Sequence, residues 1–213
     1  MLSYTGAGTA LQELMYGFIM ALIFVYGTRF GVLEFSDVVT FSLTVIGMCV
    51  TWGVIDGIIF YYIWKMDARR QMKIISNEDN MPREERLSEL MDYFDGTALS
   101  IVSDKDVERI CNDILDCQVE SAEEFEADRK KQIQNSIGCA FFGSIPVIPV
   151  LIPLYIIDDL MDALFASCLV SSVLLFIIGY SMAKYIGTNK FLTGAVLAGI
   201  SLAISVVSVF TGG

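Results

Sequence analysis

Long apolar runs separated by short polar segments dominate the chain. The clearest run extends from Val38 to Trp64 and contains a single charged residue, Asp56. About 20 apolar residues suffice to cross a bilayer core of roughly 30 Å as a helix, so this run predicts a membrane span. Similar runs predict four more spans, at residues 11–32, 136–157, 163–182 and 191–210. The predicted fold class is therefore all-α, a polytopic membrane protein with five transmembrane helices.

Residues 66–135 form a polar segment between the second and third spans. Between Leu87 and Phe94, apolar residues recur at i, i+3, i+4 and i+7, which predicts an amphipathic helix. Ser103 and Asp106 resemble a capping box, and we expect one long helix from 104 to 134. The pattern divides the chain into three parts. These are residues 1–65 with spans 1 and 2, a cytosolic helical insert at 66–135, and residues 136–213 with spans 3 to 5.

The composition supports this division and limits the chemistry. Of the 213 residues, 54% are hydrophobic, which is high for a soluble domain. Residues 66–132 contain 18 acidic and 10 basic residues, and this acidic balance argues against nucleic acid as a partner. The chain has no His, so any metal site must use carboxylates, Met sulfur and carbonyls. The five Cys form no CxxC pair and are interpreted as reduced packing residues.

Basic residues predict the orientation. With the insert in the cytoplasm, 13 of the 14 Lys and Arg lie on the cytoplasmic side and only Arg29 lies outside. This is the asymmetry of the positive-inside rule. Five spans then place the N-terminus in the cytoplasm and the C-terminus outside.

Asp56 is the strongest candidate for chemistry. At about 1.5 Å per residue it lies roughly 13 Å from the Lys65 end of its span, close to the membrane midplane. An ionised carboxylate at that depth is costly and persists only with a partner or a water-filled cavity. Two interpretations remain open. The carboxyl either bonds to a neighbouring helix and fixes packing, or it is a cation or proton site.

The first and third spans contribute further candidates. Met20 lies about 12 Å from the inner edge of the first span, at a depth similar to that of Asp56. It is either core filler or a soft ligand for Fe²⁺. Glu13 is either an interfacial charge or the inner mouth of the same path. Three prolines from Pro146 to Pro153 must distort the third span, and they either alter packing or expose carbonyls to a pathway.

An acidic face is predicted on the long helix of the insert. Its members, within roughly 100° of arc, are Asp113, Asp116, Glu120, Glu123 and Glu124. Packing against the amphipathic helix would bring Glu85 and Glu89 close to it. Clustered oxygens without imidazole suit divalent cations, whereas a solvated surface is the other interpretation.

Three stretches resemble the vacuolar iron transporter family. ELMYG at Glu13–Gly17 is similar to the opening of the family's first span, and TWGVIDG at Thr51–Gly57 to a segment ending in a carboxylate. GSIPVIP at Gly143–Pro149 is similar to its Gly/Pro-rich third span. Five spans with an acidic helical insert between the second and third also resemble the family's layout. A prokaryotic branch with WGIIDG-like second spans is nearer still, which implies the plasma membrane.

The resemblance implies a homodimer that exports Fe²⁺ or Mn²⁺ from the cytosol, typically in exchange for protons. The metal would be cargo and no resident cofactor is expected, so the partners are divalent ions, the lipid bilayer and a second copy of the chain. On this hypothesis metal collects at the insert, passes Glu13 and reaches a midplane site of Met20 and Asp56.

A second hypothesis belongs to a different class, a non-transporting membrane anchor whose insert binds a protein partner. It predicts that the apolar residues from Leu87 to Phe94 stay exposed and that the acidic face binds no ion. An enzyme is the least favoured class, because the sequence has no His and no Ser or Cys beside a recognisable base.

Overall fold

The computed structural model describes residues 6–77, 80–95, 97–116 and 122–211, without the side chains of residues 98, 100 and 122–127. These described residues form helices, turns and short connections, and contain no strand. Five helical segments among them are long and apolar enough to cross a membrane. The predicted all-α fold with five candidate spans is therefore confirmed.

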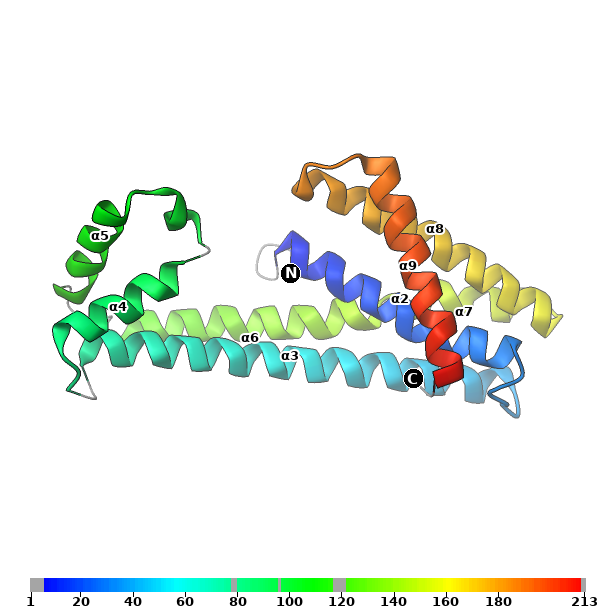
Figure 1. Ribbon diagram of the computed structural model, residues 1–213. Helices are drawn as coiled ribbons and strands as arrows, with labels where there is room; N and C mark the ends of the chain where they lie inside the picture. The colour runs from blue at the N-terminus through cyan, green and yellow to red at the C-terminus, as the bar shows by residue number, and fades with distance from the viewer. Residues whose placement is uncertain (1–5, 78–79, 96, 117–121, 212–213) are drawn as a thin grey trace. The chain divides into compact units, whose positions relative to one another are not determined.

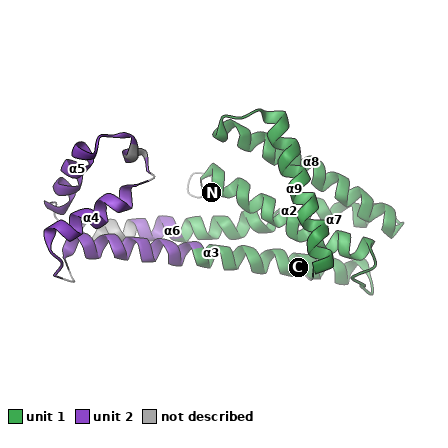
Figure 2. Ribbon diagram, in the orientation of Figure 1, with its two compact units in different colours: residues 1–59, 133–213 green, residues 60–132 purple. Residues whose placement is uncertain are grey.

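The spans are formed by six helices (Figure 1). They are α2 (Ala7–Arg29), α3 (Val38–Ser76), α6 (Ala122–Ser144) with α7 (Val147–Ile156), α8 (Leu160–Ile186) and α9 (Lys190–Thr211). The insert adds α4 (Arg83–Phe94), the short 3-10 helix η1 (Ala98–Ile101) and α5 (Asp104–Asp116). Contacts divide the chain into a membrane unit, residues 1–59 with 133–213, and an insert unit, residues 60–132 (Figure 2).

Helix α2 is the central helix of the membrane unit. It packs against α7, α8 and α9, and the thiol of Cys49 on α3 lies 3.8 Å from the carbonyl oxygen of Gly17. Phe18, Leu22 and Val25 are at most 3% exposed and belong to the apolar core. Because lipid is as apolar as these side chains, close packing rather than exclusion from water holds such helices together.

Small residues let α3 and α6 approach each other closely. A Cβ added to Gly57 of α3 would lie 2.5 Å from the carbonyl oxygen of Ser136 on α6. A Cβ added to Gly53, one turn earlier, would lie 2.8 Å from the carbonyl oxygen of Ala140. No side chain fits at such distances, so the two backbones meet because both positions are glycine.

Prolines divide the third span into α6 and α7. Pro146 is the N-cap of α7, and Pro149 lies in the first turn, where a backbone N–H has no intrahelical partner to lose. Pro153 lies inside α7. The distorted segment is surrounded by protein, because Val150 is buried and its carbonyl accepts a hydrogen bond from the hydroxyl of Ser167 on α8 at 2.7 Å. This is the condition under which irregular backbone is tolerated at membrane depth.

The insert unit has a small apolar core of its own. Its buried members are Ile74, Leu90, Val107, Cys111 and Leu115. Leu90 of α4 is 2% exposed, and the predicted packing of the amphipathic helix against the helix that follows it is confirmed. The backbone N–H of Asp106 donates to the hydroxyl of Ser103 at 3.4 Å, as the capping pattern predicted.

The single long helix expected at 104–134 includes residues 117–121, which lie outside the described residues. On either side of them the structure describes α5, up to Asp116, and α6, from Ala122 to Ser144. The apolar side of α5 packs on α4, whereas α6 continues into the third span, so the expected start of that span at residue 136 lies inside α6. Of the predicted acidic face, Asp113 and Asp116 lie on α5, and Glu123 and Glu124 lie on α6.

We expect Gly57→Ala to destabilise the membrane unit by roughly 1–3 kcal/mol, as overpacking typically does, because its Cβ would meet the backbone of Ser136. Gly47→Ala on the same helix is the matched control, since a Cβ there meets nothing within 4 Å and alanine favours helix. Thermal unfolding in detergent, followed by circular dichroism, should give a lower midpoint for Gly57→Ala alone. Equal midpoints for the two variants would contradict the close approach of α3 and α6.

Candidate metal path

Glu13 is a buried carboxylate on the central helix α2. Its side chain is 1% exposed, and neither carboxylate oxygen has a hydrogen-bond partner among the described residues. One turn later, a Cβ on Gly17 would collide with the carbonyl oxygen of Gly143 on α6. A Cβ on Gly143 would itself lie 3.4 Å from Oε2 of Glu13. The carboxylate of Glu13 thus lies against α6 at a point where α6 has no side chain.

Asp56 brings a second carboxylate from α3 to the same region. It is half-buried, and its charge interacts with that of Glu13. The Cα of Gly53, one turn before Asp56, lies 3.2 Å from the position of a Cβ on Gly143, so α3 and α2 meet the same residue of α6. The helices α2, α3 and α6 therefore hold two acidic groups in one neighbourhood.

Cys139 of α6 is a third member of this region. It is fully buried, and its thiol interacts electrostatically with both Glu13 and Asp56. Cys139 is a free, buried thiol, which agrees with the prediction of a reduced packing cysteine. Its position four residues before Gly143 places it on the same face of α6 as that glycine.

These side chains share one region but do not form a metal cage. Among the described residues, no three His, Cys, Asp or Glu side chains lie close enough together to hold a metal ion. Met20, predicted to share a site with Asp56, lies two turns along α2 from Glu13 and packs against the apolar core. The region nevertheless offers carboxylate oxygen, which suits hard divalent cations, and thiol sulfur, which suits softer ones.

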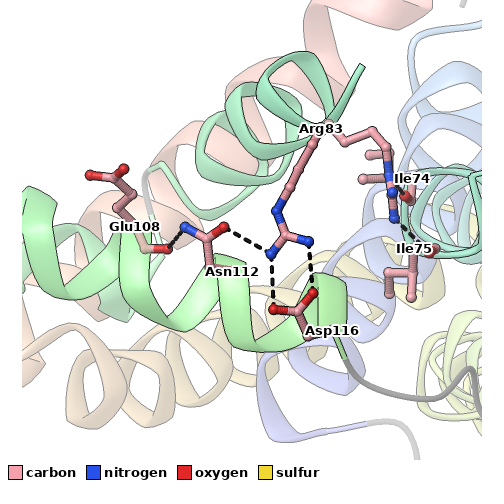
Figure 3. A network of polar contacts seen from close by, with 7 residues as sticks. Ile74, Ile75, Arg83, Glu108, Asn112 and Asp116 are labelled. Carbon is pink, nitrogen blue, oxygen red and sulfur yellow. Dashed lines mark hydrogen bonds and ion pairs between the residues drawn. The ribbon is translucent and has the colours of Figure 1, made fainter. Parts of the chain in front are cut away.

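In the insert, cationic side chains already compensate two of the predicted metal ligands. Asp116 accepts hydrogen bonds from Arg83 Nη1 at 2.7 Å and Nη2 at 2.9 Å (Figure 3). The Arg83 guanidinium holds the pKa of Asp116 below its usual range. Glu89 lies 3.9 Å from Arg70. Arg83 thus reaches Asp116 from α4, a partner that the sequence pattern of the acidic face did not show.

The remaining predicted ligands of the insert are exposed or lie outside the description. Glu85 in the first turn of α4 and Asp113 on α5 are exposed. Glu120 lies outside the described residues, as do the side chains of Glu123 and Glu124 on α6.

Arg86 is a buried cation that the sequence pattern did not predict. It is 9% exposed and donates from Nε to the carbonyl of Ile74 at 2.6 Å and from Nη2 to that of Ile75 at 2.7 Å. These carbonyls belong to the last turn of α3, where the negative end of the helix dipole lies. Arg86 thus caps α3 and connects it to α4. Its position four residues before Leu90, on the apolar side of α4, was the available signal.

The exposed apolar surface required by the anchor hypothesis is not present on α4. Leu90 is buried, and the other predicted docking residues, Leu87, Met91 and Phe94, pack against the core of the insert unit.

The fold and the buried acidic groups define a polytopic helical membrane protein with ionisable side chains inside its helix bundle. Residues 63–213 match the model of the VIT family. Because the match covers well over half of the chain, the protein belongs to the VIT family, and the resemblance to the vacuolar iron transporters is confirmed. A search of the curated proteins finds no match.

Membership of this family indicates metal-ion transport by a multi-pass membrane protein rather than an enzymatic activity. Glu13 and Asp56 precede the matched residues, so any role for them rests on the geometry described above.

Replacing Arg83 by Gln is expected to return the pKa of Asp116 toward the ordinary value of about 3.9, because the cation that favours the carboxylate is lost. In the wild type the folded-state pKa lies below the unfolded one. The ion pair therefore stabilises the insert above the ordinary pKa, and this contribution is lost as the pH falls through the folded-state value.

Carbon-13 NMR titration of the Asp carboxyls in detergent measures this change. Asp37 is an internal control, since the backbone N–H of Thr40 and not an arginine is the main reason that its pKa is lowered. The Asp37 curve should be identical in both proteins. An Asp116 curve that does not move in Arg83→Gln would contradict the ion pair.

Proposed function

We propose that this protein exports a divalent transition metal, Fe²⁺ or Mn²⁺, from the cytosol in exchange for protons, as a homodimer in the plasma membrane. The observation that carries the proposal is the buried carboxylate of Glu13, without a hydrogen-bond partner among the described residues. A charged carboxylate removed from water costs several kcal/mol unless a cation or donors compensate it. A cation bound beside Glu13 and Asp56 would supply that compensation.

The available ligands support the choice of ion. The chain contains no His, so the path offers the carboxylates of Glu13 and Asp56 and the thiol of Cys139. Carboxylates suit Mn²⁺, and addition of a softer sulfur ligand favours ions further along the first transition row, such as Fe²⁺. When an ion leaves, protons can neutralise the same carboxyls, which is the chemistry that exchange requires.

The basic residues support export from the cytosol. The positive-inside rule favours a cytoplasmic insert and N-terminus, because 13 of the 14 Lys and Arg then face the cytoplasm. The acidic insert would gather cations on that side, before they reach Glu13.

Two features support a homodimer. Most of the apolar window of α3 is not buried within one chain, which leaves surface for a second copy. Two carboxylates and one thiol are also fewer ligands than the six or so that Mn²⁺ prefers. A second α2 and α3 would double the number of acidic groups along the path.

We expect Glu13→Gln and Asp56→Asn each to lower metal flux by about 10- to 100-fold, in the range seen when a residue supporting a metal site is lost. Each substitution keeps the size of the side chain and removes its charge. Mn²⁺ entry into proteoliposomes, followed with an entrapped fluorescent indicator, measures the effect. Glu34→Gln is the control, because Glu34 is exposed in the connection between α2 and α3 and should leave the flux unchanged.

If the Glu13→Gln variant transports metal as fast as the wild type, the buried carboxylate has no role in transport and the proposal is overturned. Thermal unfolding of each variant separates a lost site from a lost fold, since a neutral side chain at a buried position should not lower the midpoint. An imposed pH gradient tests the exchange, because flux coupled to protons must change with its direction.

We further propose that the exposed carboxylates of the insert gather metal. The support is the excess of eight negative charges over residues 66–132 and the exposure of Glu85 and Asp113, with Glu120, Glu123 and Glu124 adding acidic groups along the sequence. Oxygen-only ligands of this kind bind divalent cations.

Calorimetry of the full chain with Mn²⁺ should show weaker binding, by about tenfold, in the Glu85→Gln/Asp113→Asn double variant. Asp162→Asn, which removes a carboxylate at the start of α8, is the control and should bind as the wild type does. An unchanged isotherm in the double variant would leave the acidic insert with a role in solubility only.

A further inference from the structure

A cavity of about 480 Å³ lies in the membrane unit, between α2, α6 and the ends of α8 and α9 that face each other. Two lysines, Lys184 and Lys190, line it together with hydroxyl groups and aromatic rings from Tyr180 and Tyr185. The opposite part of its lining is apolar and includes Leu14 of α2. None of its described lining residues is acidic, so the cavity is positive.

The turn between α8 and α9 brings the two lysines together. Lys184 lies in the last turn of α8, which ends at Gly187 with a φ of 75°, and Lys190 is the first residue of α9. The Nζ atom of Lys190 lies 5.7 Å from the ring centroid of Tyr180. Within the described part of the chain neither lysine forms an ion pair, so both charges remain available to an anion.

An apolar cavity of about 350 Å³ shares Leu14 with the first. All of its described lining residues are apolar, and they include Ile145 at the end of α6 and Leu174 and Ile177 on α8. Together the two cavities offer a charged end and a hydrocarbon end.

The combined length of the two cavities matches one leaflet of a bilayer. Leu174, Ile177, Ser181 and Lys184 recur on one face of α8, at i, i+3, i+7 and i+10. From Leu174 to Lys184 the helix rises about 15 Å, which is half of the roughly 30 Å hydrocarbon core.

We propose that these cavities form one binding site for an anionic phospholipid. The phosphate lies between Lys184 and Lys190, and an acyl chain runs past Leu14 along Ile177. Basic pockets between transmembrane helices on the cytoplasmic side are suited to anionic headgroups, and tyrosines favour the membrane interface. A soluble phosphate would use the lysines and leave the apolar cavity without a function, so the observations favour a lipid. The site goes beyond the proposed transport and does not depend on it.

Native mass spectrometry of the full chain, after incubation with phosphatidylglycerol or phosphatidylcholine in detergent, tests the site. The wild type should retain phosphatidylglycerol preferentially. Lys184→Gln/Lys190→Gln should weaken its retention about 25-fold, roughly fivefold for each lysine. Lys105→Gln, which removes an exposed lysine of α5, is the control and should retain as much lipid as the wild type. Ile177→Trp, which fills the apolar cavity, should also lower retention while both lysines remain.

Equal retention by the lysine double variant and the control would overturn the proposal, as would equal retention of the two lipids by the wild type. Displacement of phosphatidylglycerol by glycerol phosphate at the same concentration would identify a soluble phosphate site instead. Lipid carried by monomers and absent from dimers would show that a second copy covers the cavities, and would also overturn it. Thermal unfolding of each variant in phosphatidylcholine checks the fold. Metal flux is a separate readout, so a failure here is distinguishable from a failure of the transport proposal.

Discussion

The placement of two carboxyl groups, Glu13 and Asp56, in one region of the helix bundle is the constraint on which the membrane unit depends. Two carboxylates brought together away from water repel each other and lose hydration, so these groups cannot be what holds α2 and α3 together. The attraction comes from backbone contacts with α6, which Gly17, Gly53 and Gly57 permit. The apolar core around α2 adds to it. Packing thus holds together two acidic groups that repel each other when both are charged. Such an arrangement is one that a bound cation would stabilise.

In the insert, by contrast, arginine side chains compensate part of the negative charge. Arg83 forms a bidentate pair with Asp116, and Arg86 is directed at the carbonyls that end α3. These contacts hold α4 against α3 and α5 around a small apolar core. An exposed ion pair contributes little to stability on its own, so Leu90 and its neighbours are the main source of cohesion. The arginines set the register in which these apolar residues meet. The carboxylates that pair with arginine help to position the helices of the insert, whereas the exposed carboxylates can bind solvent or cations.

Much of this architecture was predictable because bilayers constrain sequences strongly. Length and hydropathy were enough to find the five spans, and the rarity of charges inside them singled out Asp56. The burial of Glu13 was not predictable, because position near the end of an apolar run is equally compatible with an interfacial charge. Depth can be counted along a helix axis, but which side chains meet depends on the rotation of each helix about that axis. The nearness of Cys139 to Glu13 and the pairing of Arg83 with Asp116 were not predicted for this reason, since the partners lie on other helices.

The start of the third span shows the same limit in another form. Hydropathy placed it at residue 136, because the residues before that position are polar, whereas α6 begins at Ala122 and continues through it to Ser144. Hydropathy marks where an apolar run begins, and a helix extends beyond that run wherever its backbone hydrogen bonds continue. The bounds of a span and the bounds of its helix are therefore separate questions, and the apolar pattern answers only the first.

Helix α2 separates the acidic region from the cavities that we assign to a lipid. Glu13 and Leu14 are successive residues, about 100° apart around the helix, and Gly17 and Phe18 repeat this division one turn later. Glu13 and Gly17 lie against α6, whereas Leu14 and Phe18 line the apolar cavity. Contact with the backbone at Gly143 leaves α2 no room to move toward α6. The cavity beside Leu14 and Phe18 is open space on another face of α2, so an acyl chain that filled it would limit movement of α2 in that direction as well.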